Sequence, residues 1–138
     1  METRKFMEKL FSHYCKNEMK EFFSYFDEHT IWNIHGNHPL AGEYKTIANL
    51  ENAYYQLNQF YEGTPEQRLR HLVCENHKAC AFLYDEITGR DGKKYQIEYW
   101  LLLEMSKDGK KVIWVDNFLD TEQLMRVMHS GKSTRKTA

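Results

Sequence analysis

The stretch HTIWNIHGNHPLAGEY, residues 29–44, decides the fold of this chain. Apolar and polar residues alternate over residues 30–35, which predicts a short strand. Trp32 and Ile34 fall on one face of this strand. The residues GNHP then break the strand, and a second turn at Gly42 leads into a helix. A tryptophan on a strand that ends in a loop with His and Gly is typical of the wall and rim of a concave site.

The composition is that of one globular domain. The chain has 138 residues, and we expect a single domain over 1–130 followed by a disordered basic tail over 131–138. Aromatic residues make up 14%, which indicates a large apolar interior, a lined cavity or an oligomer interface. The net charge of −1 argues against a nucleic-acid binder, because neutralising phosphates requires clustered Lys and Arg.

The sequence also predicts a soluble, cytoplasmic protein. Its three cysteines are widely spaced and form no CxxC motif, which favours free thiols in a reducing compartment. The N-terminus METRKFMEKL is charged and lacks the apolar core of a signal peptide. No run approaches the ~18 apolar residues that a membrane span needs.

The hydrophobic period changes from helical to strand-like along the chain, which predicts an α+β domain of order α-α-β-α-β-β-β-β-α. Asp-Gly pairs at 91–92 and 108–109 indicate hairpins. We expect helices over 3–16, 18–26, 44–61 and 122–129, and strands over 30–35, 69–75, 79–88, 95–105 and 112–119.

Two segments carry a resemblance to a known family. FDEHTIWNIHGNHPLAGEY (26–44) and GRDGKKYQIEYWLLLEMSKDGKKVIWVDNFLDTEQL (89–124) are similar to the SnoaL-like branch of the nuclear transport factor 2-like superfamily. The resemblance implies a cystatin-like cone, in which a curved antiparallel sheet wraps around about three helices and a cavity opens at one end. Relatives include polyketide cyclases, ketosteroid isomerase and limonene epoxide hydrolase, and others only bind ligands or proteins. Many dimerise through the outer sheet face.

Asp116 is the candidate catalytic residue. Strict alternation along 112–119 places Trp114, Asp116 and Phe118 on one face, and alignment with the relatives turns this face into the cone. Desolvation between two aromatic rings would raise the pKa of Asp116 and fit it for general acid–base catalysis. The alternative is a surface carboxylate on the other face or one held by a basic neighbour.

The histidines are weaker candidates. His38, in the loop after the first strand, could act as an auxiliary acid or base at the rim. His35 and His38 form an H-x-x-H pair, but a metal site needs at least three converging ligands, so we expect no metal. His71 shares a predicted strand face with Leu69 and Val73, where it is either a hydrogen-bonded core residue or part of the pocket.

The remaining predicted site residues are walls of the cavity, with ordinary core packing as the alternative for each ring. They are Trp32, Ile34, Tyr14, Tyr55, Tyr99, Trp114 and Phe118. Trp100 and Leu102 lie on the opposite face of the long strand and predict a homodimer contact.

Together these features predict a pocket for a small hydrophobic molecule. If the protein is an enzyme, we expect cofactor-independent proton transfer on a carbonyl-bearing substrate, of the cyclase or isomerase type. The alternative is a non-catalytic ligand-binding or protein-interaction module of the same fold. Neither nucleic acid nor a membrane is an expected partner.

Overall fold

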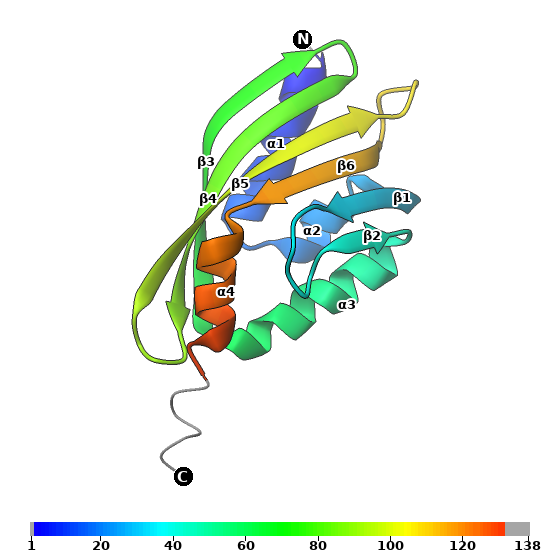
Figure 1. Ribbon diagram of the computed structural model, residues 1–138. Helices are drawn as coiled ribbons and strands as arrows, with labels where there is room; N and C mark the ends of the chain where they lie inside the picture. The colour runs from blue at the N-terminus through cyan, green and yellow to red at the C-terminus, as the bar shows by residue number, and fades with distance from the viewer. Residues whose placement is uncertain (1, 132–138) are drawn as a thin grey trace.

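A computed structural model describes residues 2–131 (Figure 1), so all of the predicted tail over 131–138 except its first residue lies outside the described residues. The helices are α1 (Glu2–Cys15), α2 (Met19–Phe23), α3 (Ile47–Leu57) and α4 (Thr121–His129), with a short 3₁₀ helix, η1 (Asn58–Phe60). The strands are β1 (Phe26–Ile34), β2 (Gly42–Tyr44), β3 (Tyr61–Glu75), β4 (Lys78–Gly89), β5 (Lys94–Met105) and β6 (Val112–Leu119).

All six strands form one sheet in the order β2-β1-β6-β5-β4-β3. The pair β1–β6 is parallel, and the other neighbouring pairs are antiparallel. The long hairpins of β3, β4 and β5 bend together, and α1 and α2 lie behind the concave face in the view of Figure 1. The predicted α+β class and curved sheet are confirmed, with β2 as an additional short strand.

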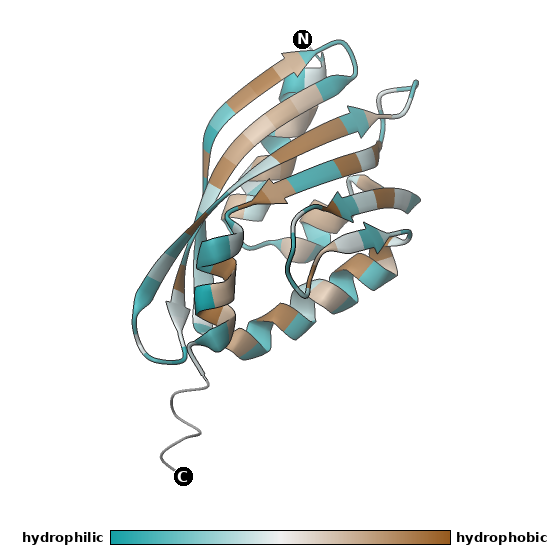
Figure 2. Cartoon of the chain, viewed as in Figure 1, coloured by the Kyte–Doolittle hydropathy of each residue, from teal (hydrophilic) through white to brown (hydrophobic). Residues whose placement is uncertain are grey.

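The core lies between the helices and the concave face of the sheet. Along β5, buried and exposed residues alternate without interruption, which puts Ile97, Tyr99 and Leu101 inside. Helix α1 contributes Met7, Leu10 and Phe11, whose three- and four-residue spacing forms one apolar stripe. In Figure 2 apolar residues run along the middle of β3, β4 and β5, whereas the hairpin ends are hydrophilic.

Helix α3 is shorter than its sequence pattern predicted. It begins after Thr46, whose side-chain oxygen accepts a hydrogen bond from the backbone N–H of Asn49 at 3.2 Å. It ends at Leu57, and the chain then passes through η1 into β3, which begins at Tyr61. The segment with Gly63 and Pro65 is therefore part of a long edge strand rather than a helix stop.

Two bulges reverse the side-chain faces that alternation predicted. In β6, Val112 pairs with Met105 while Trp114 pairs with Glu104, so Ile113 is an extra residue. Beyond the bulge Val115 is buried, and Trp114 and Phe118 are exposed on the outer face.

The second bulge lies in the edge strand β3. Leu69 pairs with Leu83 and His71 with the next residue, Phe82, so Arg70 is the extra residue. Leu69 therefore packs against the core, whereas His71 lies on the outer face.

Candidate functional site

The concave side of the sheet encloses a cavity of about 140 Å³. Most of its wall is apolar and comes from α2, α3, β1, β4, β5, β6 and α4. Five of the lining residues carry a hydroxyl, carboxyl or amide group: Tyr14, Tyr54, Asp85, Tyr99 and Asn117. An apolar cavity of about 150 Å³ can hold one benzene molecule, so this space fits a single ring.

A chain of hydrogen bonds crosses one wall of the cavity. The Tyr99 hydroxyl donates to Oδ1 of Asp85 at 2.7 Å. The hydroxyls of Tyr14 and Tyr99 are 2.6 Å apart. When Asp85 is ionised, the single hydroxyl hydrogen of Tyr99 is engaged with its carboxylate, so Tyr14 donates to Tyr99. The Gln67 amide also hydrogen-bonds the Asp85 carboxylate.

Three secondary-structure elements bring this chain together. On β4 the inward positions are Ala81, Leu83, Asp85 and Ile87, so the carboxylate sits in an otherwise apolar row. Tyr99 of β5 pairs with Leu83 and reaches Asp85 diagonally across the strand pair. Tyr14 approaches from the last turn of α1.

The surroundings of Asp85 favour its neutral form. Its partly buried side chain borders the cavity, and desolvation by the surrounding protein raises its pKa from 3.8 to about 7. The hydrogen bonds from Tyr99 and Gln67 act in the opposite direction and only partly offset burial. Burial followed by the nearby Asp85 charge also raises the pKa of the Tyr14 and Tyr99 hydroxyls well above 10.0.

The structure places four of the predicted wall residues in the cavity lining: Trp32, Ile34, Tyr14 and Tyr99. Tyr55 does not line it, because on α3 the neighbouring Tyr54 faces inward and Tyr55 is 54% exposed. His71 stacks on Phe82 on the outer face, with ring planes within 8°.

Trp114, Asp116 and Phe118 also lie on the outer face, so the prediction that they face the cavity was wrong. The bulge at Ile113 is the physical reason, because it moves Asn117 and Leu119 to the inside instead.

Asp116 is a well-bonded carboxylate on that outer face. Its Oδ1 lies 2.8 Å from Nε2 of His35, and its Oδ2 accepts a hydrogen bond from the Trp114 indole at 3.0 Å. Asn33 donates a longer bond of 3.4 Å. Burial would raise the pKa of Asp116, but these hydrogen bonds outweigh it and hold the pKa below 3.8. This is the opposite of the predicted direction.

His38 orders the loop after β1 and does not line the cavity. Its Nδ1 accepts from the backbone N–H of Leu40 at 3.2 Å, so Nε2 carries the hydrogen and donates to the His35 carbonyl at 3.0 Å. Gly36 has a φ of +121°, and a Cβ there would lie 2.9 Å from the His38 ring. A glycine is therefore required beside this histidine.

The residue that the sequence reasoning missed is Asp85. The signal was present in residues 79–88, ACAFLYDEIT, where every second residue is Ala, Ala, Leu, Asp and Ile. A single acid on an otherwise apolar strand face indicates a buried carboxylate. Among residues 2–131 no cluster of three or more His, Cys, Asp or Glu is arranged to hold a metal. No helix in that part of the chain is long and apolar enough to cross a membrane.

No protein-family model matches this sequence, and no curated protein matches it. Solved structures match it closely in shape. An NTF2-like protein of Burkholderia thailandensis is 14% identical with a TM-score of 0.79, over 91% of this chain and 96% of that one. TerC, co-crystallized with polyporic acid, is 12% identical with a TM-score of 0.79, over 94% and 99%.

A third solved structure, PrhC of Penicillium brasilianum, is 13% identical with a TM-score of 0.76, over 97% of this chain and 90% of that one. Likeness at such low identity is a likeness of fold. The chain therefore has the nuclear transport factor 2-like fold, which the resemblance of its sequence implied.

Proposed function

We propose that this protein binds a small, carbonyl-bearing ring compound in its cavity and catalyses cofactor-independent proton transfer on it, with Asp85 as the residue that holds and releases the proton. The observation that carries this proposal is the chain Tyr14–Tyr99–Asp85 in the wall of an apolar cavity of single-ring size. The role predicted for Asp116 passes to Asp85, because Asp85 is the carboxylate that lines the cavity.

The cavity gives Asp85 the properties of a general acid–base. A carboxylic acid with a pKa of about 7 is present in both protonation states at neutral pH. Its ionised form can take a proton from carbon next to a carbonyl, and its protonated form can return one to the enolate. The apolar wall excludes water and strengthens the hydrogen bonds that stabilise the developing charge.

The test uses small cyclic ketones and 1,3-diketones in D₂O, with exchange of their α-protons followed by NMR. We expect exchange above the buffer rate and a loss of at least ~100-fold in Asp85→Asn, in line with the usual contribution of a general base. Asp116→Asn makes the same carboxylate-to-amide change on the outer face and should keep the rate. Retained exchange in Asp85→Asn would contradict the proposed role of Asp85.

The second candidate is a ligand-binding module without catalysis. The size and apolar wall of the cavity support binding by themselves, whatever the chemistry of Asp85. If the ketones bind to the wild-type protein but their α-protons do not exchange, the protein is a ligand-binding module without catalysis.

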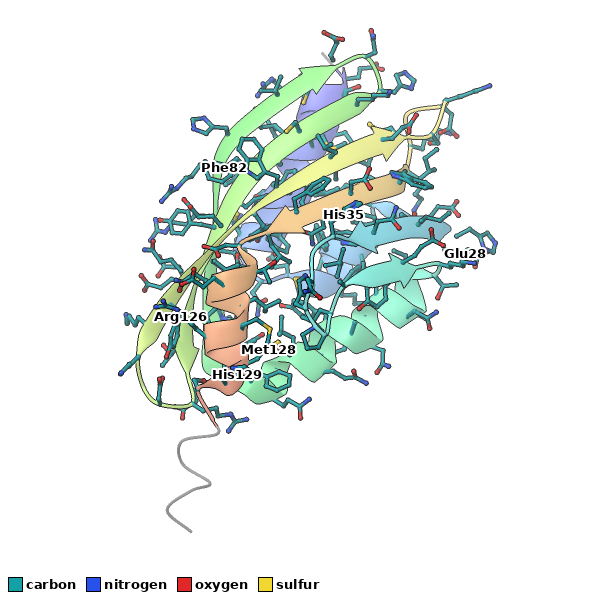
Figure 3. All side chains as sticks on the ribbon, in the orientation of Figure 1. Glu28, His35, Phe82, Arg126, Met128 and His129 are labelled. Carbon is teal, nitrogen blue, oxygen red and sulfur yellow. The ribbon has the colours of Figure 1, made fainter. Side chains whose placement is uncertain are left out.

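We further propose a homodimer through the outer sheet face. Five rings form a row across the strands there: His71, Phe82, Trp100, Phe118 and His35. Figure 3 labels two of them, Phe82 on β4 and His35 at the end of β1. Trp100 is 47% exposed and Phe118 43%, and a second copy of the same row would cover them.

A further inference from the structure

The direction of the hydrogen-bond chain in the cavity wall depends on one proton. An ionised carboxylate can only accept, so Tyr99 must donate to Asp85 and Tyr14 must donate to Tyr99. The hydrogen of Tyr14 is then engaged in the chain. In this state Tyr14 presents only oxygen lone pairs to the cavity that it lines.

Protonation of Asp85 allows the opposite direction. A carboxylic acid has an O–H, which can donate to Tyr99 across the same 2.7 Å. Tyr99 can then donate to Tyr14 across the same 2.6 Å, which leaves the Tyr14 O–H free to point into the cavity. Both directions use the same heavy-atom positions, so the reversal needs only rotation of two hydroxyl hydrogens.

We propose that Tyr14 is the group that hydrogen-bonds the oxygen of the ligand and that Asp85 controls this bond through Tyr99, so that one proton on Asp85 converts this wall of the cavity from a hydrogen-bond acceptor into a donor. The catalytic meaning of this inference rests on the proposed function. The protonated state selects a carbonyl oxygen, and the ionised state selects the hydroxyl of an enol or phenol. We therefore expect the cavity to bind both the keto form and the enol form of its ligand, each in one protonation state of Asp85.

The same chain can deliver a proton with all atoms accounted for. Asp85 gives its proton to the Tyr99 oxygen, Tyr99 gives its own to Tyr14, and Tyr14 gives its own to the enolate oxygen of the ligand. Each tyrosine loses one proton and gains one, so both end neutral. Asp85 ends ionised and the ligand ends as the enol.

The groups around Asp85 allow this titration near neutral pH. The titratable side chains whose charges interact with it are Tyr14 and Cys15 of α1, Tyr54 of α3, Tyr61 of β3 and Tyr99 of β5. Desolvation dominates the pKa of Asp85, which is about 7, and the hydrogen bonds from Tyr99 and Gln67 lower it.

The test is the pH dependence of equilibrium binding of cyclohexanone, a neutral ring that only accepts hydrogen bonds, followed by NMR titration. We expect about tenfold tighter binding at pH 5.5 than at pH 8.5, the effect of one hydrogen bond to the ligand. Tyr14→Phe and Tyr99→Phe should bind weakly at both pH values. Tyr95→Phe removes a hydroxyl from the same strand as Tyr99 that donates to Asp91 outside the cavity, and it should keep the tenfold difference.

The outcomes separate this inference from the proposed function. If Tyr14→Phe keeps the full pH dependence, Asp85 itself bonds the oxygen of the ligand and the relay is wrong, while proton exchange by Asp85 can stand. If the wild-type protein binds cyclohexanone equally at both pH values, or does not bind it, the relay is also wrong. If the pH dependence is present and α-proton exchange is absent, the relay stands and the catalytic proposal fails.

Discussion

The imidazole of His35 lies flat on the ring of Phe118, with centroids 4.2 Å apart and planes within 5°, while its Nε2 meets Asp116 at 2.8 Å. This relationship fixes Asp116 on the outer face of the sheet, across β6 from the cavity. The molecule therefore carries two contrasting aspartates. Asp116 is held as a carboxylate by donors, and Asp85 is kept partly protonated by desolvation.

The first prediction concerns Asp116. Its pKa is lowered in the folded state, so its contribution to stability is present above pH 3.8 and is lost as the pH falls through the folded-state pKa. Asp116→Asn should lower the free energy of unfolding by about 1 kcal/mol at pH 7. The difference should disappear in acid. Urea unfolding at pH 7 and at pH 2.5 measures both values, and an equal difference at the two would contradict the prediction.

Asp85 should show the opposite dependence on pH. Its folded-state pKa is raised from 3.8 to about 7, so its contribution to stability is present below 3.8 and is lost as the pH rises to 7. Ionisation of Asp85 in the folded protein therefore lowers the free energy of unfolding at pH 8 by on the order of 4 kcal/mol. Asp85→Asn removes this penalty and should raise the melting temperature at pH 8, with a much smaller effect at pH 4. If the variant is equally destabilised at both pH values, ionisation of Asp85 does not lower the stability of the folded protein.

The sequence predicted the fold because long uninterrupted patterns carry it. The alternation of β5 and the helical stripe of α1 appear directly in the order of residues. The site was harder to predict, because Ile113 and Arg70 are single extra residues that exchange the two faces of a strand. A bulge depends on the pairing of two strands that are distant in the sequence, so no local sequence pattern predicts it. The acid in β4, which has no such irregularity, could have been found by alternation.

The aromatic row predicts the oligomeric state. Trp100 stacks on Phe82 at 4.5 Å and is directly paired with Phe118, so it stands at the centre of the row. Trp100→Glu should convert a dimer into a monomer, because two charges would face each other in the buried contact. Light scattering after size exclusion measures the mass. Tyr55→Ser removes a similarly exposed ring from α3 and should leave the dimer intact. A monomeric wild-type protein would exclude the dimer.

Filling the cavity should separate ligand binding from stability. Ala53 of α3 lines the cavity, and Leu at this position would extend into its apolar space. We expect cyclohexanone binding to weaken at least tenfold, whereas the free energy of unfolding should rise by about 0.5–2 kcal/mol, as cavity-filling substitutions commonly achieve.

The control is Ala48→Leu, the same change at an exposed position of the same helix, which should leave ligand binding unchanged. If Ala53→Leu binds cyclohexanone as well as the wild-type protein does, the ligand occupies a different place. The polar chain of Tyr14, Tyr99 and Asp85 would then be a buried structural network.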